Sequence, residues 1–293
     1  MANRDIFARI TQQIIDAIEH GADDYQMPWH RRGTATHTPL NAVTRRPYRG
    51  INTLLLWATA EAEAYATGRW ATYRQWREAG AQVRKGETAT PILFWKPLGS
   101  SQSDDEADQD EQGRRPRLLA RVYNVFNAAQ VDGEVLPSEP SRDDVARITA
   151  ADAFFSKVGA DVRHGADEAC YRPELDRIQM PDFARFRDAG AYYSVLGHEH
   201  VHWTGAKQRL DRDLTGRFGS DRYAMEELVA ELGAAFLLGH LDLPNEPRRD
   251  HAPYLASWLG VLRADTKAII AVASKAQAAA DFLIGRSQGC PIN

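Results

Sequence analysis

The chain has 293 residues, of which 43% are hydrophobic, and a formal net charge of −4. This length can bury one large core or two ordinary ones and weakly favours two domains. The slightly acidic balance excludes a globally basic nucleic-acid binder, so any basic surface must be local. Two isolated cysteines, Cys170 and Cys290, exclude a disulfide framework and suit a reducing compartment.

The N-terminal stretch, residues 1–25, carries acidic residues and lacks the apolar segment of a secretory signal. No uninterrupted apolar run in the chain reaches the length of a membrane span. We therefore expect a cytoplasmic protein that does not enter a membrane.

The first element is an amphipathic helix. Apolar residues recur at helical spacing from Ile6 to Ile18, and Gly21 stands where such a helix would end. A second helix is expected over Asn52–Thr67. Between Pro28 and Lys96 the chain is rich in arginine and aromatic residues, which sets this region apart from the rest.

Two expected strands flank a segment of unusual composition. Thr90–Lys96 (TPILFWK) and Arg121–Asn127 (RVYNVFN) have strand-like composition. Residues 98–117 between them are polar, acidic and without aromatics, which predicts a solvated, flexible insert. We expect this insert to join two paired strands and not to separate domains.

A Pro/Ser-rich stretch, Pro137–Ser141, marks the expected boundary between domains 1–136 and 137–293. The second domain is expected to begin with a helix over Asp143–Val158 and a hairpin with its turn near Pro173. Three more helices are expected, at Asp182–Thr204, Asp221–Leu241 and Ala252–Gly285, the last long enough to contain a break. The predicted fold is α+β, with an N-terminal mixed α/β domain and a mainly helical C-terminal domain that carries a small antiparallel sheet.

A metal-binding motif lies on the helix expected at Asp182–Thr204. His198-Glu199-His200-Val201-His202 matches HExxH. Positions i and i+4 share a helix face, so His198 and His202 can hold one cation, while Glu199 lies beside it as a general base and His200 points elsewhere. Two imidazoles and a carboxylate suit zinc (Zn²⁺), with another divalent transition metal as the alternative. A helix with solvated histidines also matches this short motif, but the apolar neighbours favour a buried site.

The third ligand must come from elsewhere, because Gln208 occupies the position where some zincins carry a third histidine. The helix of Met225–Leu237 offers Glu227 and Glu231, one turn apart on one face, with Glu226 aside. We expect Glu227 to be the ligand and Glu231 to orient a histidine ring, although the two can be exchanged. An oxyanion-stabilising group is also expected. Unranked candidates for it are Tyr171, Tyr192, Tyr193, Tyr223, His240 and His251.

The arginine-rich region predicts a surface for single-stranded DNA. From Pro28 to Lys96 there are eleven cations against four anions, an excess of +7, interleaved with aromatics. Cations follow phosphates and aromatic rings stack on unpaired bases, although many of these aromatics can equally belong to a core. No sequence-specific reader is recognisable, so strong base preference is not expected. The expected contacts are Arg45, Arg46, Tyr48, Arg49, Asn52, Trp70, Tyr73, Arg84, Lys85, Trp95 and Lys96.

Nearly the whole chain resembles the ArdC-type antirestriction proteins of conjugative plasmids. The N-terminal resemblance is carried by NAVTRRPYRGINTLLLW, RWATYRQWREAGAQVRKGETATPILFW and RVYNVFNAAQVDG. The C-terminal resemblance is carried by YYSVLGHEHVHWTGAKQRLDR and FGSDRYAMEELVAELGAAFLLG. It implies a single-stranded DNA-binding domain shared with TraC-type primases and a zincin-like metallopeptidase domain. The acidic insert at 98–117 departs from the compact hairpin of the family.

The sequence is compatible with three hypotheses about function. The resemblance implies protection of incoming DNA from host restriction during conjugation, by a zinc peptidase tethered to a DNA-binding domain. Its peptidase substrate would be a protein of host or plasmid origin. The alternative is a non-catalytic DNA-binding protector with a structural or vestigial metal site. A nuclease ranks last, because nucleases favour clustered carboxylates with Mg²⁺ or Mn²⁺.

Overall fold

The structure, a computed structural model, describes residues 2–21, 27, 29–30, 38–97, 118–133, 144–216, 220–245 and 252–290. The acidic insert expected at 98–117 and the linker expected at Pro137–Ser141 lie outside these residues. The insert and the domain boundary therefore stay predictions.

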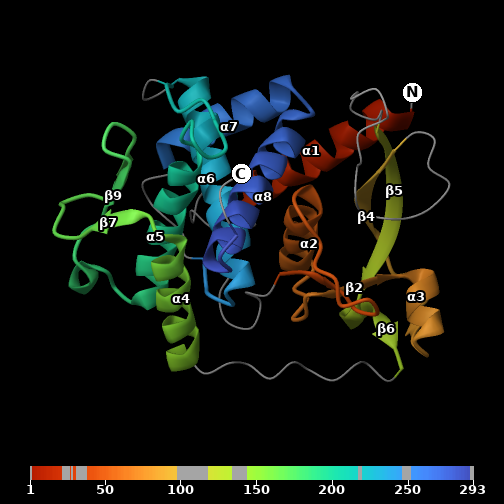
Figure 1. The fold of residues 1–293 in the computed structure, drawn as a ribbon. Helices are drawn as coiled ribbons and strands as arrows, with labels where there is room; N and C mark the ends of the chain where they lie inside the picture. Colours follow the sequence, from red (N-terminus) through yellow and green to blue (C-terminus); the bar gives the residue numbers. More distant parts are fainter. Residues whose placement is uncertain are drawn as a thin grey trace, which may run out of the picture.

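Two helices begin the fold. α1 (Ala2–Gly21) confirms the predicted N-terminal helix and its end at Gly21. α2 (Ile51–Ala62) is shorter than the expected Asn52–Thr67 helix. The chain leaves the helix because Ala64 adopts a positive φ of 52°, which is not helical. α1 packs on both α2 and α7 (Ala252–Ala264), so it links the two halves of the molecule (Figure 1).

The N-terminal sheet has four strands in the order β1-β2-β5-β4. Its strands are β1 (Leu40–Asn41), β2 (Arg69–Thr72), β4 (Thr90–Pro97) and β5 (Leu118–Asn127). β4 and β5 pair antiparallel along their length, which confirms both predicted strands. A short helix α3 (Tyr73–Glu78) follows β2, and β3 (Gln82–Val83) pairs with β6 (Val131–Asp132) beside it.

The β4–β5 ribbon has different surroundings on its two faces. Phe94 of β4 pairs with Arg121 of β5, and Tyr123 lies two residues further along, so these three side chains share one face. Phe94 and Tyr123 are 49% and 43% exposed and meet edge to face, with ring centroids 5.6 Å apart. Trp95 lies on the opposite face and stacks on Phe7 of α1 at 6.2 Å. α1 therefore meets one face of the ribbon at Trp95, which stays 44% exposed, and the outer part of the other face is open at Phe94, Arg121 and Tyr123.

The C-terminal half is mainly helical, as predicted. Its helices besides α7 are α4 (Asp144–Val158), α5 (Ala189–Thr204), α6 (Asp221–His240) and α8 (Ala268–Ser287). α5 begins later than expected because Asp188 caps it, accepting the Ala191 N–H at 2.8 Å. The break expected in the last helix is confirmed, because α7 ends at Ala264 and α8 begins at Ala268.

A small sheet precedes α5. Its strands β7 (Asp161–Arg163), β8 (Cys170–Arg172) and β9 (Arg177–Gln179) lie in the order β7-β9-β8. β8 and β9 form the predicted antiparallel hairpin, but β7 pairs with β9 in parallel. The sheet is therefore mixed: it contains the predicted antiparallel pair and a parallel strand that the sequence analysis did not predict. β9 is the central strand, so β7 and β8 form the two edges, and β8 runs antiparallel to β9, its one partner among the described strands.

One hydrophobic core spans both halves. Ile10 of α1 and Leu55 of α2 belong to the same buried cluster as Leu228 of α6 and Val272 of α8. Among the described residues, α8 is the one helix long and apolar enough to cross a membrane by composition. Its small side chains instead pack against α4, α5 and α6, as in the core helix of a globular protein.

Gly233 of α6 sets the distance between α5 and α6. A Cβ added at Gly233 would lie 2.9 Å from both methyl groups of Val201. We expect Gly233→Ala to lower the free energy of unfolding by about 1–3 kcal/mol, because overpacking displaces the helix pair. Urea unfolding followed by circular dichroism measures this change.

Gly260→Ala in α7 is the matched control, since a Cβ there meets no atom within 4 Å. It should leave stability unchanged or raise it by about 0.5–1 kcal/mol, as alanine is the better helix former. Equal stability of the two variants would contradict close α5–α6 packing at Gly233.

Candidate metal centre

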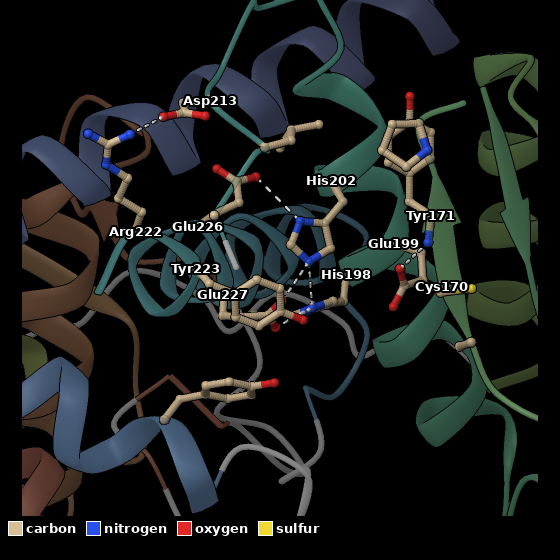
Figure 2. Close-up of a pocket in the computed structure, with 15 residues that line it drawn as sticks. Cys170, Tyr171, His198, Glu199, His202, Asp213, Arg222, Tyr223, Glu226 and Glu227 are labelled. Carbon is tan, nitrogen blue, oxygen red and sulfur yellow. Dashed lines mark hydrogen bonds and ion pairs between the residues drawn. The ribbon is translucent and has the colours of Figure 1, made fainter. Parts of the chain in front are cut away.

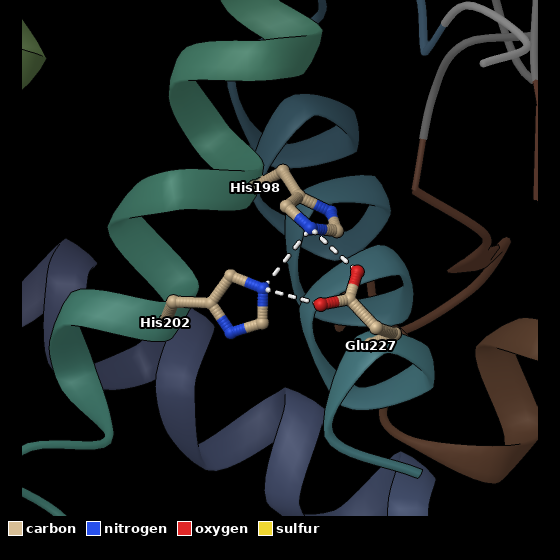
Figure 3. A group of neighbouring side chains, drawn as sticks. All are labelled: His198, His202 and Glu227. Carbon is tan, nitrogen blue, oxygen red and sulfur yellow. Dashed lines mark hydrogen bonds and ion pairs between the residues drawn. The ribbon is translucent and has the colours of Figure 1, made fainter. Parts of the chain in front are cut away.

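Helices α5 and α6 bring three ligand groups together. His198 and His202 lie one turn apart on the face of α5 that packs on α6, and Glu227 projects from α6 between them (Figure 3). The two Nε2 atoms are 3.1 Å apart, and the Glu227 oxygens lie 3.3 Å from His198 Nε2 and 3.4 Å from His202 Nε2. One ligand atom from each residue lies within 4.8 Å of the other two. Two imidazoles and a carboxylate at this spacing fit a divalent transition metal.

Each imidazole is held from behind by a further glutamate. Nδ1 of His198 lies 3.2 Å from Glu231, and Nδ1 of His202 lies 3.3 Å from Glu226. These contacts place the protons on Nδ1, so each Nε2 presents its lone pair to the site. The geometry thus separates the two candidate ligands: Glu227 faces the Nε2 atoms, and Glu231 lies behind His198. Glu226, which the sequence places aside, supports His202 and is itself bound by Arg212 at 2.8 Å.

The electrostatics of the site favour a cation. Burial alone would raise the pKa of Glu227, but hydrogen bonds to His198 and His202 lower it well below its usual range. Burial alone would lower the pKa of His202, but Glu226 and Glu227 raise it to about 10. Without a metal, these carboxylates keep a proton on the imidazole, and a divalent cation can take the place of that positive charge.

Glu199 is buried beside the ligands and held in place. The backbone N–H of Tyr171, on strand β8, donates to its carboxylate at 2.8 Å. The Tyr171 hydroxyl donates to Asp176 at 2.8 Å, and Arg209 bridges Asp176 and the Tyr171 oxygen. The guanidinium of Arg209 stacks on Trp203 of α5 at 3.9 Å. The β8–β9 hairpin is thereby fixed on the HExxH helix with Glu199 between them.

The ligands lie on the wall of a cleft of about 320 Å³ between β8, α5 and the start of α6 (Figure 2). Of the candidate oxyanion-stabilising groups, Tyr171 and Tyr223 line it. Burial and the charge of Glu227 raise the pKa of the Tyr223 phenol, so it stays a hydrogen-bond donor. Tyr192 and Tyr193 are buried in the core, His240 is exposed at the end of α6, and His251 lies outside the described residues.

His200 points away from the ligands, as the sequence predicts. Its Nδ1 donates to the Leu196 carbonyl at 2.7 Å, and its ring lies 4.8 Å from that of Phe155. Burial lowers the pKa of His200 to about 4, so it is a neutral core residue.

Three of the expected DNA contacts are interior residues, which corrects the prediction. Trp70 and Tyr48 are buried in one small core cluster, so neither ring can stack on a base. Asn52 is buried and bonds both backbone groups of Leu93, at 2.7 and 2.8 Å. All three residues belong to the aromatic-rich region, but their side chains are buried in the interior of the domain. Sequence alone does not show which aromatics a helix will cover.

The other expected contacts vary in their surroundings. Arg45, Arg46, Tyr73, Lys85 and Trp95 are exposed. Arg49 pairs with Asp281 of α8, and Arg84 pairs with Glu87 at 2.7 Å. The side chain of Lys96 lies outside the described part of the chain. The exposed residues stay predictions. Phe94, Arg121 and Tyr123, which are not among the expected contacts, are exposed together on one face of the β4–β5 ribbon.

Comparison with known proteins matches both parts of the chain. Residues 4–126 match the N-terminal domain of the anti-restriction factor ArdC, and residues 149–275 match a zincin-like metallopeptidase. The metal-free crystal structure of the antirestriction protein ArdC from plasmid R388 is 35% identical, with a TM-score of 0.78. It aligns over 98% of this chain and 99% of its own. The chain belongs to the ArdC family of antirestriction proteins.

A second solved structure and a further relative are also similar to this chain. The Mn(II)-bound structure of R388 ArdC is 36% identical with a TM-score of 0.77, over 97% of this chain and 99% of its own. That relative therefore binds a divalent metal. An uncharacterized protein of Sinorhizobium fredii, y4eC, is 53% identical over 95% of this chain and 91% of its own.

A DNA primase TraC of Escherichia coli is 37% identical over 96% of this chain but over 27% of the primase. A second TraC primase is 33% identical, with 20% of its length covered. The chain thus spans about a quarter or less of these primases, and the match includes both halves of the fold.

The geometry predicts different losses of metal affinity on changing the two glutamates. Glu227→Gln should weaken metal binding by more than about 100-fold, because it removes a charged ligand. Glu231→Gln should weaken it by about 10- to 100-fold, the range for partners that orient a ligand. Titration with zinc against a chromophoric chelator measures both.

Arg222→Gln is the control, since Arg222 lines the same cleft but lies 78% exposed and pairs with Asp213. It should leave metal affinity unchanged. A larger loss in the Glu231 variant than in the Glu227 variant would reverse the assignment of ligand and support.

Proposed function

We propose that this ArdC-family protein binds single-stranded DNA with little sequence preference and hydrolyses a peptide bond at its HExxH site. Acting in the cytoplasm, it protects incoming DNA from host restriction during conjugation. The peptidase part of this proposal rests on one observation: His198, His202 and Glu227 converge beside the buried carboxylate of Glu199. A purely structural metal site does not need this fourth group.

Different residues of the cleft have different roles in the proposed peptide hydrolysis. A divalent cation on the three ligands supplies Lewis-acid polarisation of a water molecule and of the substrate carbonyl. Glu199 takes the proton from the water and returns it to the leaving amine, and the Tyr171 N–H keeps its carboxylate oriented. The Tyr223 phenol, which borders the same space beside Glu227, donates a hydrogen bond to the developing oxyanion (Figure 2).

The ion that this site takes is Zn²⁺ in our proposal, with another divalent transition metal as the alternative. Two neutral imidazoles and one carboxylate are a ligand set of catalytic zinc sites. The Mn(II)-bound structure of R388 ArdC supports a divalent ion in the family.

An extended segment of a host or plasmid protein is the proposed substrate. Among the described strands β8 pairs with β9 alone, and Ala169, Cys170, Tyr171 and Pro173 line the cleft. Edge strands bind extended peptides by adding a strand, so a peptide bound along β8, through backbone groups other than the Tyr171 N–H that Glu199 accepts, would pass in front of the ligands.

The open face of the β4–β5 ribbon is the proposed DNA surface. It presents Phe94 and Tyr123 as neighbouring exposed rings with Arg121 beside them. Rings of this kind stack on unpaired bases of any sequence, and a cation beside them neutralises phosphate. Arg45, Arg46 and Lys85 add exposed positive charge elsewhere in the same domain. The match to DNA primases supports contact with DNA.

The alternative function is a protector that acts by occupying DNA, with a metal site that only stabilises the fold. The continuous core gives this alternative some support, because the ligands lie on helices that also hold the two halves together. A nuclease remains the least favoured candidate, since a histidine pair suits zinc better than Mg²⁺.

Glu199→Gln separates the two functions. The glutamine keeps an oxygen to accept the Tyr171 N–H but cannot accept a proton from water. We expect metal content and single-stranded DNA affinity to persist while restriction protection in recipient cells is lost. Retention of all three would show that the chemistry of Glu199 is dispensable, which favours protection by occupancy.

Replacing the two exposed rings tests the DNA surface. The double variant Phe94→Ala/Tyr123→Ala should lower single-stranded DNA affinity by about tenfold or more, because base–aromatic stacking contributes about 1–3 kcal/mol per base. Fluorescence anisotropy with a labelled oligonucleotide at fixed salt measures it. Val122→Ala is the control, since Val122 is 43% exposed on the opposite face of the same strand. Equal affinity of the double variant and the control would exclude this face.

A further inference from the structure

A buried histidine from the N-terminal half reaches the metal centre. His30 precedes β1, and its Nε2 lies 3.2 Å from an oxygen of Glu231. The other oxygen of Glu231 lies 3.2 Å from Nδ1 of His198. His30, Glu231 and His198 are all at most 2% exposed, so this chain of contacts is shielded from water. A buried carboxylate with partners on both oxygens is held in position by them.

The direction of each hydrogen bond follows from one backbone contact. The Met27 N–H donates to Nδ1 of His30 at 3.0 Å, so in neutral His30 the proton lies on Nε2 and is donated to Glu231. Glu231 then accepts from Nδ1 of His198 with its second oxygen, which directs the Nε2 lone pair of His198 toward the metal site.

The segment that carries His30 is fixed against α6 and α7. Trp29 is fully buried, with its ring 6.2 Å from that of Trp258 in α7. Its carbonyl accepts a hydrogen bond from the Asn245 side chain at 3.2 Å. Trp258 in turn donates to the Ala224 carbonyl of α6 at 2.7 Å. His30 is therefore held at a fixed distance from the helix that carries Glu227 and Glu231.

We propose that His30 is a positioning residue of the metal centre, supplied by the N-terminal domain and acting through Glu231 on His198. His30 falls within the match to the ArdC N-terminal domain, and Glu231 and His198 fall within the zincin-like match. The metal centre thus depends on both domains. This inference rests on the proposed metal site, and it extends that site to a residue outside the metallopeptidase domain.

Two substitutions of His30 separate positioning from packing. His30→Asn places an oxygen near the position of Nδ1, so it keeps the bond from Met27 but is too short to reach Glu231. His30→Gln extends to the position of Nε2 and keeps a donor for Glu231. Trp29→Phe is the control, because it alters packing of the same segment, keeps an aromatic ring beside His30 and takes no part in the His30–Glu231 contact. Zinc affinity and the visible absorption of the cobalt(II)-substituted protein are measured on the full chain, with apo-protein melting temperature in parallel.

We expect His30→Asn to weaken zinc binding by about tenfold, the lower end for residues that orient a metal ligand, and to shift the cobalt(II) absorption band. His30→Gln and Trp29→Phe should stay within about threefold of the native affinity, with an unchanged band. The cobalt(II) spectrum reports ligand geometry, which a purely structural role of His30 would not change.

The inference is overturned if His30→Asn and His30→Gln bind zinc alike, whether both equal the native chain or both are equally weakened. If His30→Asn does not fold, a loss of affinity or a shifted band in the folded His30→Gln protein overturns it, and native behaviour there supports it. Absence of zinc binding by the native chain would instead refute the proposed metal site, so the two failures are distinguishable.

Discussion

The close approach of α5 and α6 is the constraint on which the site depends. Gly233 offers no side chain, so Val201 of α5 can lie against the backbone of α6. On α5 this contact lies within one turn of both histidines, and on α6 it lies less than two turns from Glu227. It places Nε2 of His198 and His202 within reach of Glu227. α8 packs on both helices and closes the other side. The geometry of the site is therefore set by core packing and not by a loop.

Placing so many ionisable groups in this core opposes stability unless each has a partner. Glu226 is bound by His202 and Arg212, and Glu231 is bound by two imidazoles. In the centre of the cluster, Glu227 and the two Nε2 atoms contact one another, and the Tyr223 side chain also bonds Glu227. This arrangement of partners is typical of a metal site, in which the ligands surround the position of the cation and outer side chains keep the ligands aligned.

Local patterns in the sequence predicted the local parts of the structure. The spacing of His198, Glu199 and His202 depends on one helix, and helical periodicity alone is enough to place them. The choice between Glu227 and Glu231 depends on the rotation of α6 about its axis relative to α5, which spacing within α6 does not determine. His30 has no local signal at all, because its partner is distant in sequence and the contact exists only after the domains have packed.

The proposed DNA surface shows that sequence patterns also predict strands only in part. Alternation along β4 and β5 divides Phe94 and Trp95 between two faces, and this could be predicted from sequence. How each face is packed depends on contacts distant in sequence, such as that of Phe7 in α1, which stacks on Trp95. Trp70 and Tyr48 are interior because α2 and the sheet enclose them. Composition identified the region but could not separate its core aromatics from its exposed ones.

The shared core also bears on how such proteins spread between genomes. Separating the two halves would uncover Ile10 and Leu55 on one side and Leu228 and Val272 on the other, leaving each fragment with an apolar surface that invites aggregation. A recombination event between the halves would thus yield two poorly folding products. The alignment with the TraC primases, which runs across 96% of this chain inside a much longer protein, fits a pair of domains inherited as one piece.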